Sequence, residues 1–290
     1  MFRFFICLAL LVQAPSSPSF DSNKAWEHLR QLVGFGPRPA GSAAIEQSRT
    51  YIKNQLSAIG VPVTEQAWDD QTPTGRVHMV NLIATVPGAS KNRLVIGGHY
   101  DTKKFPFRFV GANDGGSSTA VLLELARLFK SQPHELTIEL LFFDGEEARM
   151  PEWRGVDNTY GSRYYVENAV KSGTIGGLKT LVLLDMVGDK NLNIMRDSNS
   201  TPWLVDIIWT TAARLGHSGS FINQLTTVED DHIPFVRAGV PVVDVIDLDN
   251  PTWHTAQDTI ENVSARSLQI VGDVIAAAAP EIEKRLAAAR

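Results

Sequence analysis

The sequence predicts an α/β fold, in which a single globular domain holds a mostly parallel, mixed central sheet with helices on both faces. Strand-like apolar runs alternate with amphipathic helices along most of the 290 residues, as in parallel sheets built from strand–helix–strand units. Hydrophobic residues make up 43% of the chain, which is enough for a substantial core. No repeat, low-complexity run or long linker divides the sequence, so we expect one domain over residues 20–290.

The domain is expected to begin with two helices and two strands. A helix is predicted over 22–36, with Ser22 as its N-cap, and a segment rich in Gly and Pro ends it. Apolar residues recur at helical spacing over 43–59, which predicts a second, amphipathic helix. Two strand-like runs follow, at 61–68 and 78–86.

From residue 93 onward, strands and helices alternate. The expected strands are 93–98, 136–143, 180–188 and 240–247. The expected helices are 117–131, 160–170, 202–216 and 264–289. The strands are continuously apolar, which indicates burial on both faces of a parallel sheet. Their carboxyl ends would therefore meet at one edge of the sheet, where open α/β sheets bind their ligands.

The first residues are typical of a secretory signal peptide, which we expect over 1–19. They combine a short basic start, an apolar run of about ten residues and a small or polar exit. The run is too short to span a membrane, and an N-terminal strand or anchor is the alternative. We therefore expect an exported protein, periplasmic or secreted. Cys7, the only cysteine, lies in this segment, so the mature chain would have neither a disulfide nor a thiolate.

Charge and composition exclude some classes of partner. The formal net charge is −5 and no basic patch stands out, so nucleic acid is not an expected partner. We expect no stable membrane insertion, and we expect the protein to act as a monomer.

Polar side chains collect where the predicted strands end. These residues, which either follow a strand or lie in the glycine-rich segment before the helix 117–131, are His99, Asp101, Asp114, Glu146, Glu147, Asp185 and His254. Histidines and carboxylates at one edge of a sheet are the ligand set that zinc takes. The sequence therefore predicts a metal site at this edge.

Each of these residues also has a simpler interpretation when it is taken alone. Asp114 precedes a helix and could be its N-cap. Glu146 and Glu147 could form a solvated first turn, and either histidine could be a hydrogen-bonded structural residue. Asp185 is harder to explain in this way, because a carboxylate directly after four apolar strand residues is costly to bury without a partner.

Six short motifs identify a resemblance. They are GHYDT, GANDGGSS, FFDGEEA, LLDMVG, DDHIPF and WHTAQDT, in that order along the chain. In this set and order they resemble the zinc aminopeptidase-like superfamily of exopeptidases, and most of all the glutaminyl cyclases of animal type and their bacterial relatives. The resemblance covers roughly residues 22–280 and implies the zinc aminopeptidase-like form of the fold.

The resemblance implies a particular set of zinc ligands. In a glutaminyl cyclase, one zinc ion per chain would be held by Asp114, Glu147 and His254. In a two-zinc aminopeptidase, His99 and Asp185 would complete a second site and the aspartate would bridge the two ions. Because cyclases keep the second His and Asp as non-ligands, these two residues cannot separate the two activities.

The resemblance also implies catalytic and pocket roles. Glu146 would be the general acid/base, which takes a proton from the attacking α-amine and delivers one to the departing ammonia. Asp230 and Asp185 would be hydrogen-bond partners in the same network. Trp153 and Trp253 would form walls of the substrate pocket, although both could instead be ordinary core aromatics.

Two further acidic residues are expected behind the ligands. Asp101 would orient His99, because outer carboxylates commonly fix the histidines of metal sites. Asp258 would support the loop that carries His254, but a surface position or a local turn is an equally good interpretation.

The expected activity is the cyclisation of N-terminal glutamine in peptides or proteins to pyroglutamate, with release of ammonia. Asp230, Trp153 and Trp253 favour this activity over the alternative, a two-zinc aminopeptidase that releases N-terminal residues; a non-enzymatic binding protein is the third hypothesis. The chain departs from the animal pattern in several places. The segment 148–159 is about one residue longer, the animal disulfide is absent, Glu229 replaces a glutamine, and Asp249 stands where an aromatic is usual.

Overall fold

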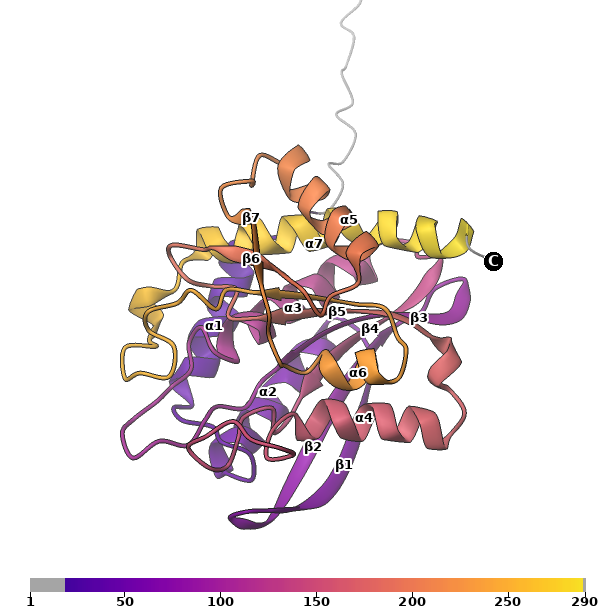
Figure 1. The fold of residues 1–290 in the computed structure, drawn as a ribbon. Helices are drawn as coiled ribbons and strands as arrows, with labels where there is room; N and C mark the ends of the chain where they lie inside the picture. The colour runs from indigo at the N-terminus through magenta and orange to yellow at the C-terminus, as the bar shows by residue number, and fades with distance from the viewer. Residues whose placement is uncertain (1–18, 289–290) are drawn as a thin grey trace, which may run out of the picture.

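The computed structural model describes residues 19–288, which fold around a six-stranded sheet in the order β1-β2-β4-β3-β5-β8 (Figure 1). The strands are β1 (Val63–Thr72), β2 (Gly75–Val86), β3 (Ser90–His99), β4 (Leu136–Phe143), β5 (Leu178–Asp185) and β8 (Val242–Ile246). Strands β4, β3, β5 and β8 pair in parallel, whereas β2 pairs antiparallel with both β1 and β4. The predicted fold class, a mostly parallel mixed sheet in an α/β domain, is therefore confirmed.

Strands β1 and β2 form one long hairpin. The sequence prediction placed two shorter strands at 61–68 and 78–86, but pairing continues to Thr72 opposite Gly75. The paired residues that lie outside the two predicted strands are mostly charged or polar, and several are exposed, so they give no apolar signal. The end of the hairpin was underestimated because strand pairing there rests on backbone hydrogen bonds rather than on burial.

Helices cover both faces of the sheet, as predicted (Figure 1). They are α1 (Ser22–Gly34), α2 (Ala43–Ala58), α3 (Gly116–Lys130), α4 (Tyr160–Lys171), α5 (Pro202–Arg214), α6 (Ile233–Arg237) and α7 (Ala265–Ala288). The larger core cluster joins the sheet to α1, α2, α3, α5 and α7, and a smaller cluster joins it to α4 and α6. Helix α1 begins at Ser22, but its N-cap is Asp21 rather than the expected Ser22: the Asp21 carboxylate accepts from the amide of Asn23.

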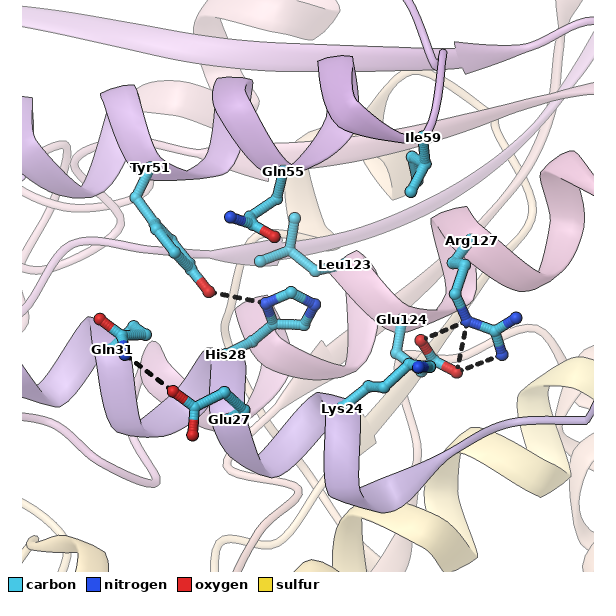
Figure 2. Close-up of a pocket in the computed structure, with 10 residues that line it drawn as sticks. All are labelled: Lys24, Glu27, His28, Gln31, Tyr51, Gln55, Ile59, Leu123, Glu124 and Arg127. Atoms are coloured by element: carbon cyan, nitrogen blue, oxygen red, sulfur yellow. Dashed lines mark hydrogen bonds and ion pairs between the residues drawn. The ribbon is translucent and has the colours of Figure 1, made fainter.

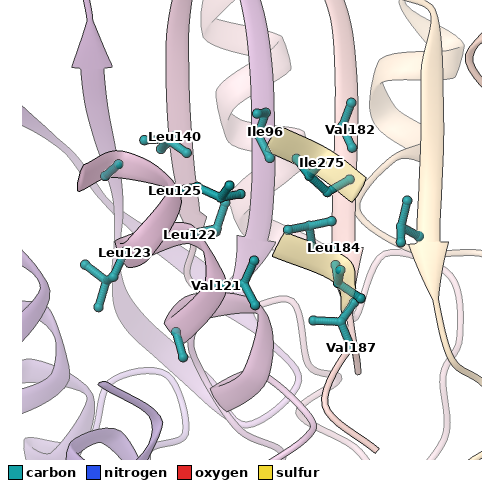
Figure 3. Packing of buried hydrophobic residues seen from close by; sticks show 14 of the residues in the cluster. Ile96, Val121, Leu122, Leu123, Leu125, Leu140, Val182, Leu184, Val187 and Ile275 are labelled. Carbon is teal, nitrogen blue, oxygen red and sulfur yellow. The ribbon is translucent and has the colours of Figure 1, made fainter. Parts of the chain in front are cut away.

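The larger core cluster is centred on α3, which is buried along nearly its whole length. Figure 3 shows its side chains between the strands and α7; the labelled residues include Ile96, Val121, Leu122, Leu125, Leu140, Val182, Leu184 and Ile275. Full burial of each such aliphatic side chain stabilises the fold by about 1.5–3 kcal/mol. This packing fixes the N-terminus of α3 against the carboxyl ends of the parallel strands.

Several short elements were not predicted. They are β6 (Ile194–Asp197), β7 (Phe221–Thr226), α6 and two single turns of 3₁₀ helix, Ile175–Gly177 and Ile260–Asn262. Strands β6 and β7 pair with each other in a separate two-stranded sheet. Each of these elements is too short for a hydrophobic period to develop.

The expected signal peptide and Cys7 lie almost wholly outside the described residues. Over the described range 19–288, no helix combines the length and the apolar character that crossing a membrane requires.

Candidate active site

A pocket of about 330 Å³ lies at the carboxyl ends of the parallel strands. Its lining includes eight of the residues selected from the sequence, which are Asp114, Glu146, Glu147, Trp153, Asp185, Asp230, Trp253 and His254. Three other selected residues, His99, Asp101 and Asp258, are not part of the lining and are buried behind it. The fold therefore brings together residues that are up to 159 positions apart in the sequence, from 99 to 258.

A second hollow, of about 500 Å³, lies between α1, α2 and α3 on another part of the molecule (Figure 2). Lys24, His28, Tyr51 and Arg127 are among its lining residues. None of the groups of His, Asp and Glu with metal-ligand spacing in the described chain includes a residue of this hollow. The strand-end pocket is therefore the candidate site.

The first possible metal group consists of Asp114, Glu147 and His254. The Nε2 atom of His254 lies 3.2 Å from Glu147 Oε1 and 3.4 Å from Asp114 Oδ2. Both carboxylates are buried, and the histidine is partly exposed toward the pocket. This is the set that the resemblance implies for a single zinc ion.

The second possible group consists of His99, Asp114 and Asp185. The Nε2 atom of His99 lies 3.1 Å from Asp114 Oδ1 and 3.1 Å from Asp185 Oδ1. Asp114 thus points one oxygen at each histidine, as a bridging ligand of two ions would. The geometry by itself accommodates either one or two metal ions.

The residues present fit a metal ion. Asp114 Oδ2 and Glu147 Oε2 are buried and have no hydrogen-bond partner, and a buried carboxylate oxygen without one is costly. Bonds of about 2.1 Å from tetrahedral zinc would place its ligands roughly 3.4 Å from one another. The contacts of His254, at 3.2 and 3.4 Å, match that spacing.

The simpler interpretations of these residues do not hold. Asp114 is not the N-cap of α3, because Gly115 occupies that position and no side chain caps the helix. Gly115 has φ +78°, and a Cβ there would come within 2.4 Å of the carbonyl oxygen of Asp101, so glycine is required. Glu146 and Glu147 are buried outside any helix rather than forming a solvated turn.

Asp258 connects the two loops that carry metal-ligand candidates. Its carboxylate accepts hydrogen bonds from the backbone N–H groups of Asn113, at 2.7 Å, and of Asp114, at 3.1 Å. It is almost fully buried, so the surface interpretation is wrong. The loop after His254 therefore holds the backbone of Asp114 in place.

Asp101 has two sets of contacts. Its Oδ1 atom lies 3.5 Å from His99 Nδ1, at ion-pair distance but without a hydrogen bond, so the orienting role of Asp101 stays a prediction. Its carboxylate also accepts from the backbone N–H groups of Glu146, at 3.1 Å, and of Glu147, at 3.4 Å. Asp101 thereby fixes the position of the glutamate pair beside the histidine.

Glu146 combines burial with several neighbouring charges. Burial, together with the carboxylates of Glu147 and Asp230, raises the pKa of Glu146 well above its ordinary value, against the opposing effect of His99. Burial and Asp185 likewise raise the pKa of Asp230 to about 7. Acidic groups with pKa values moved toward neutrality can both accept and donate protons near pH 7.

The two tryptophans line the pocket and are not core residues. Trp253 is 44% exposed and stacks on His254, with ring centroids 4.5 Å apart. Trp153 is half-buried and lines the same pocket. On the loop before Trp253, Leu248 lines the pocket, whereas Asp249, which stands where the animal pattern has an aromatic, is exposed and does not.

Three site residues were missed in the sequence. Lys103 is buried, donates to the carbonyl of Ala148 and places Nζ 3.6 Å from Glu147 Oε2. Phe105 and Phe109 contact the ring of His254 edge-on, with centroids 5.3 and 5.9 Å away. Their position directly after the GHYDT motif, with aromatics at alternate residues, was the available signal.

Arg38 was also missed, and it supports the site from behind. Its guanidinium is fully buried and donates to the carbonyl oxygens of Tyr100, Val110 and Gly111. These carbonyls belong to the segments that carry His99 and Asp114. One side chain from the break between α1 and α2 therefore connects both ligand loops.

The sheet topology, with His and carboxylate groups at its carboxyl edge, is that of an α/β fold of the zinc-exopeptidase type, and a Zn-dependent exopeptidase of Parabacteroides distasonis matches it with a TM-score of 0.82 and 25% identity, over 93% of this chain and 100% of that one. Comparison with known proteins makes this specific: the sequence pattern of Peptidase family M28 matches residues 81–279. The chain is 31% identical to a glutaminyl-peptide cyclotransferase of Gloydius blomhoffii, over 87% of this chain and 79% of the relative. The chain belongs to peptidase family M28 and, within it, to the glutaminyl cyclases.

Solved structures agree with this assignment. The crystal structure of a glutaminyl cyclase from an Acidobacteriales bacterium matches with a TM-score of 0.88 and 38% identity, over 96% of this chain and 100% of that one. A leucine aminopeptidase precursor from Bacteroides thetaiotaomicron also matches, with a TM-score of 0.84 and 28% identity, over 91% of this chain and 98% of that one. The resemblance drawn from the six motifs is thus confirmed, and the backbone alone does not separate the two kinds of activity.

Proposed function

We propose that this protein is a zinc-dependent glutaminyl-peptide cyclotransferase, which converts N-terminal glutamine of peptides or proteins to pyroglutamate and releases ammonia. The observation that carries the proposal is the position of Glu146. It is a buried carboxyl group with a raised pKa that lines the pocket beside Asp114, Glu147 and His254. The similarity to glutaminyl cyclases over most of the chain supports the same activity.

The reaction is intramolecular, so the protein mainly has to hold a compact conformer of the substrate. The α-amine attacks the side-chain carbonyl carbon of the same glutamine, a C–N bond forms, and the side-chain nitrogen leaves as ammonia. Correct orientation of two groups within one molecule can by itself remove a large part of the barrier. Trp153 and Trp253 are placed to enclose the short aliphatic chain between them and the acidic end of the pocket.

Proton transfer is assigned to Glu146. As a carboxylate it would accept the proton of the attacking amine, and as a carboxylic acid it would return a proton to the departing nitrogen. Asp230 and Asp185 line the pocket beside it and would hold hydrogen bonds as charge moves. A zinc ion held by Asp114, Glu147 and His254 would supply Lewis-acid polarisation of the carbonyl oxygen.

One specific observation favours a second candidate, a two-zinc aminopeptidase. His99, Asp114 and Asp185 form a complete second group, and Asp114 faces both histidines. In that reaction Glu146 would activate a water molecule, and the products would be a free amino acid and a shortened peptide.

A product assay decides between the two. The purified protein, supplied with zinc, is incubated with a peptide that begins with glutamine, and both ammonia and the peptide products are measured. Cyclisation yields ammonia and a peptide of full length that has lost one nitrogen. Free glutamine together with a shortened peptide would instead establish the aminopeptidase. The zinc content of the pocket groups is a second criterion, with one ion expected at Asp114, Glu147 and His254 for a cyclase and a further ion at His99 and Asp185 for an aminopeptidase.

We also propose that residues 1–19 direct export and that the enzyme acts as a monomer on peptide substrates outside the cytoplasm. Expression of the full chain with a C-terminal tag, followed by cell fractionation and N-terminal sequencing, tests the first point. Intact Met1 on the cytoplasmic form, with no exported form, would contradict it.

A further inference from the structure

A third cluster of ionisable side chains lies in the core beside the pocket. It consists of Asp230, His232 and Asp244, whose ligand atoms all lie within 4.8 Å of one another. His232 and Asp244 are fully buried, and Asp230 is 4% exposed. Asp244 occupies the middle of β8, where its four neighbours in the strand are buried valine and isoleucine residues. A charged residue at such a position requires a specific partner.

Most of the polar atoms in this cluster have no hydrogen-bond partner, although His232 has a carboxylate at ion-pair distance on each side of its ring. Both oxygens of Asp244, both ring nitrogens of His232 and Oδ2 of Asp230 are buried without a hydrogen bond. Within the described chain, no lysine or arginine forms an ion pair with Asp230 or Asp244. Unpaired buried groups of this number are rare, and a bound ion is one of the few explanations for them.

His232 is oriented as metal-binding histidines are. Its Nε2 atom lies 3.4 Å from Oδ2 of Asp197, and Asp197 is itself held by the N–H of Val228 and the hydroxyl of Ser200. This leaves Nδ1 facing Asp244 Oδ2 at 3.5 Å. A carboxylate behind one ring nitrogen, with the other nitrogen directed at further ligands, is the usual arrangement around a metal-bound histidine.

The spacing and charge of the cluster also favour a cation. The 3.5 Å between His232 and Asp244 is longer than a good hydrogen bond. It is close to the roughly 3.4 Å that separates the ligands of a tetrahedral zinc ion with bonds of about 2.1 Å. Even a protonated His232 would face three carboxylates, those of Asp197, Asp230 and Asp244. A divalent ion bound by neutral His232 would offset two of these three negative charges, one more than a proton on the ring does.

We propose that Asp230, His232 and Asp244 bind a structural divalent cation, preferably zinc, separate from the ligand groups of the pocket. The proposal does not depend on the reaction that the enzyme catalyses. Because Asp230 also lines the pocket, this ion would fix one wall of the active site from the inside.

Zinc counting in paired variants tests the proposal. The double variant His99→Ala/His254→Ala removes the histidine from both pocket groups, so zinc that remains after dialysis reports the third site. We expect about one equivalent of zinc per chain, as for a dedicated structural site. Adding Asp244→Asn to the double variant should remove this remaining zinc. Adding Asp244→Val should remove it as well, and it would also make the strand β8 wholly apolar.

Asp247→Asn is the matched control, since Asp247 is a buried carboxylate three residues further on that lies outside the cluster. It should leave the remaining zinc in the double variant unchanged. The proposal is overturned if the double variant keeps no zinc, or if Asp244→Asn keeps as much as its parent.

A second measurement does not depend on how the variants fold. Crystals of the wild-type protein grown with zinc are measured at the zinc absorption edge. The anomalous difference map is then inspected at the pocket groups around Asp114 and at the core cluster. A peak between Asp230, His232 and Asp244 supports the proposal. A peak at Asp114 with none in the core cluster rejects it, and means that protons rather than a metal ion balance the buried carboxylates.

Discussion

Among single residues, Glu146 is the one whose change should separate catalysis from metal binding. Glu146→Gln keeps the shape of the side chain but removes its ability to exchange protons, so kcat should fall by about 10²–10⁴-fold while the zinc content stays the same. Because burial raises the pKa of Glu146, this base becomes protonated at a higher pH than an ordinary glutamate does. Wild-type kcat/KM should therefore also fall as the pH is lowered.

Glu152→Gln is the control for this change, because Glu152 lies on the same loop and is exposed. It should retain activity and its pH profile. Full turnover by Glu146→Gln would mean that another group transfers the protons.

Trp253 should contribute to substrate binding far more than to folding. It is 44% exposed and its main ring contact is with His254, so Trp253→Ala removes little buried surface. The loss of one aromatic wall should raise KM for a glutaminyl peptide by about tenfold, which corresponds to roughly 1.4 kcal/mol. Trp253→Phe should restore most of the affinity. An unchanged KM in steady-state kinetics of Trp253→Ala would remove this residue from the pocket.

The sequence alone could predict the ligand candidates because most of them follow a strand end, and Asp114 lies in the glycine-rich segment before α3. His99 and Asp185 end strands, and Glu147 follows another, so the parallel sheet brings them together. Lys103 and Arg38 could not be found in this way. They interact largely with backbone carbonyl groups of distant segments, and no residue pattern records which carbonyls a folded chain leaves unpaired.

At the level of elements, the break between α1 and α2 supports the active site through Arg38. Arg38→Met would leave three buried carbonyl groups without a donor, which should lower the free energy of unfolding by at least about 3 kcal/mol. Zinc affinity should fall as well, because the same carbonyls anchor the loops of His99 and Asp114. Urea denaturation and a zinc competition titration measure the two effects.

Arg30→Met is the comparison for this variant, since Arg30 lies on the exposed face of α1. It should appreciably change neither the free energy of unfolding nor the zinc affinity. A loss of stability in Arg38→Met without any loss of zinc affinity would limit the residue to a purely structural role.

The contact between α1 and α2 should make stability depend on pH. His28 on α1 places Nδ1 2.8 Å from the hydroxyl of Tyr51 on α2 (Figure 2), and burial lowers the pKa of His28 to about 4 from 6.5. Between these values the unfolded chain binds more protons than the folded one, so stability should decline as the pH falls from 6.5 to 4.

His28→Gln should lose less stability than the wild type over this range, measured by chemical denaturation at each pH. His78→Gln is the control, because that histidine lies on β2 with about half of its side chain exposed. Identical pH curves for His28→Gln and the wild type would show that protonation of His28 does not destabilise the fold.

Long elements were predicted well, and short or polar ones were not. Helices such as α2 and α3 and the apolar strands bury a continuous face, which leaves a period in the sequence. In contrast, α6 has five residues and β6 has four, and the outer part of the hairpin β1–β2 is held by backbone pairing at an exposed edge. Their positions are fixed by the rest of the fold rather than by local sequence.

For the whole molecule, removal of metal should reduce thermal stability. A ligand present at about 100 times its dissociation constant stabilises the folded state by about 2.7 kcal/mol, which corresponds to roughly 5–10 °C in Tm for a domain of this size. A strong chelator should therefore lower Tm by that amount, and added zinc should restore it in scanning calorimetry.

Asp114→Ala is the matched variant, because Asp114 belongs to both pocket groups. Its Tm should respond less to the chelator than the wild-type Tm does, and the remaining response would come from the cluster of Asp230, His232 and Asp244. An equal response would show that the stabilising ion lies elsewhere in the molecule.

The position of Asp114 between two histidines has a thermodynamic consequence. One carboxylate serves both pocket groups, with Oδ1 toward His99 and Oδ2 toward His254, so two ions there could not bind independently. The first cation would offset negative charge that otherwise attracts the second. Each ion would therefore lower the affinity of the site for the other by the same factor. Occupancy would then rise in two separated steps, so the free zinc concentration around the protein would itself select between a mononuclear and a dinuclear centre.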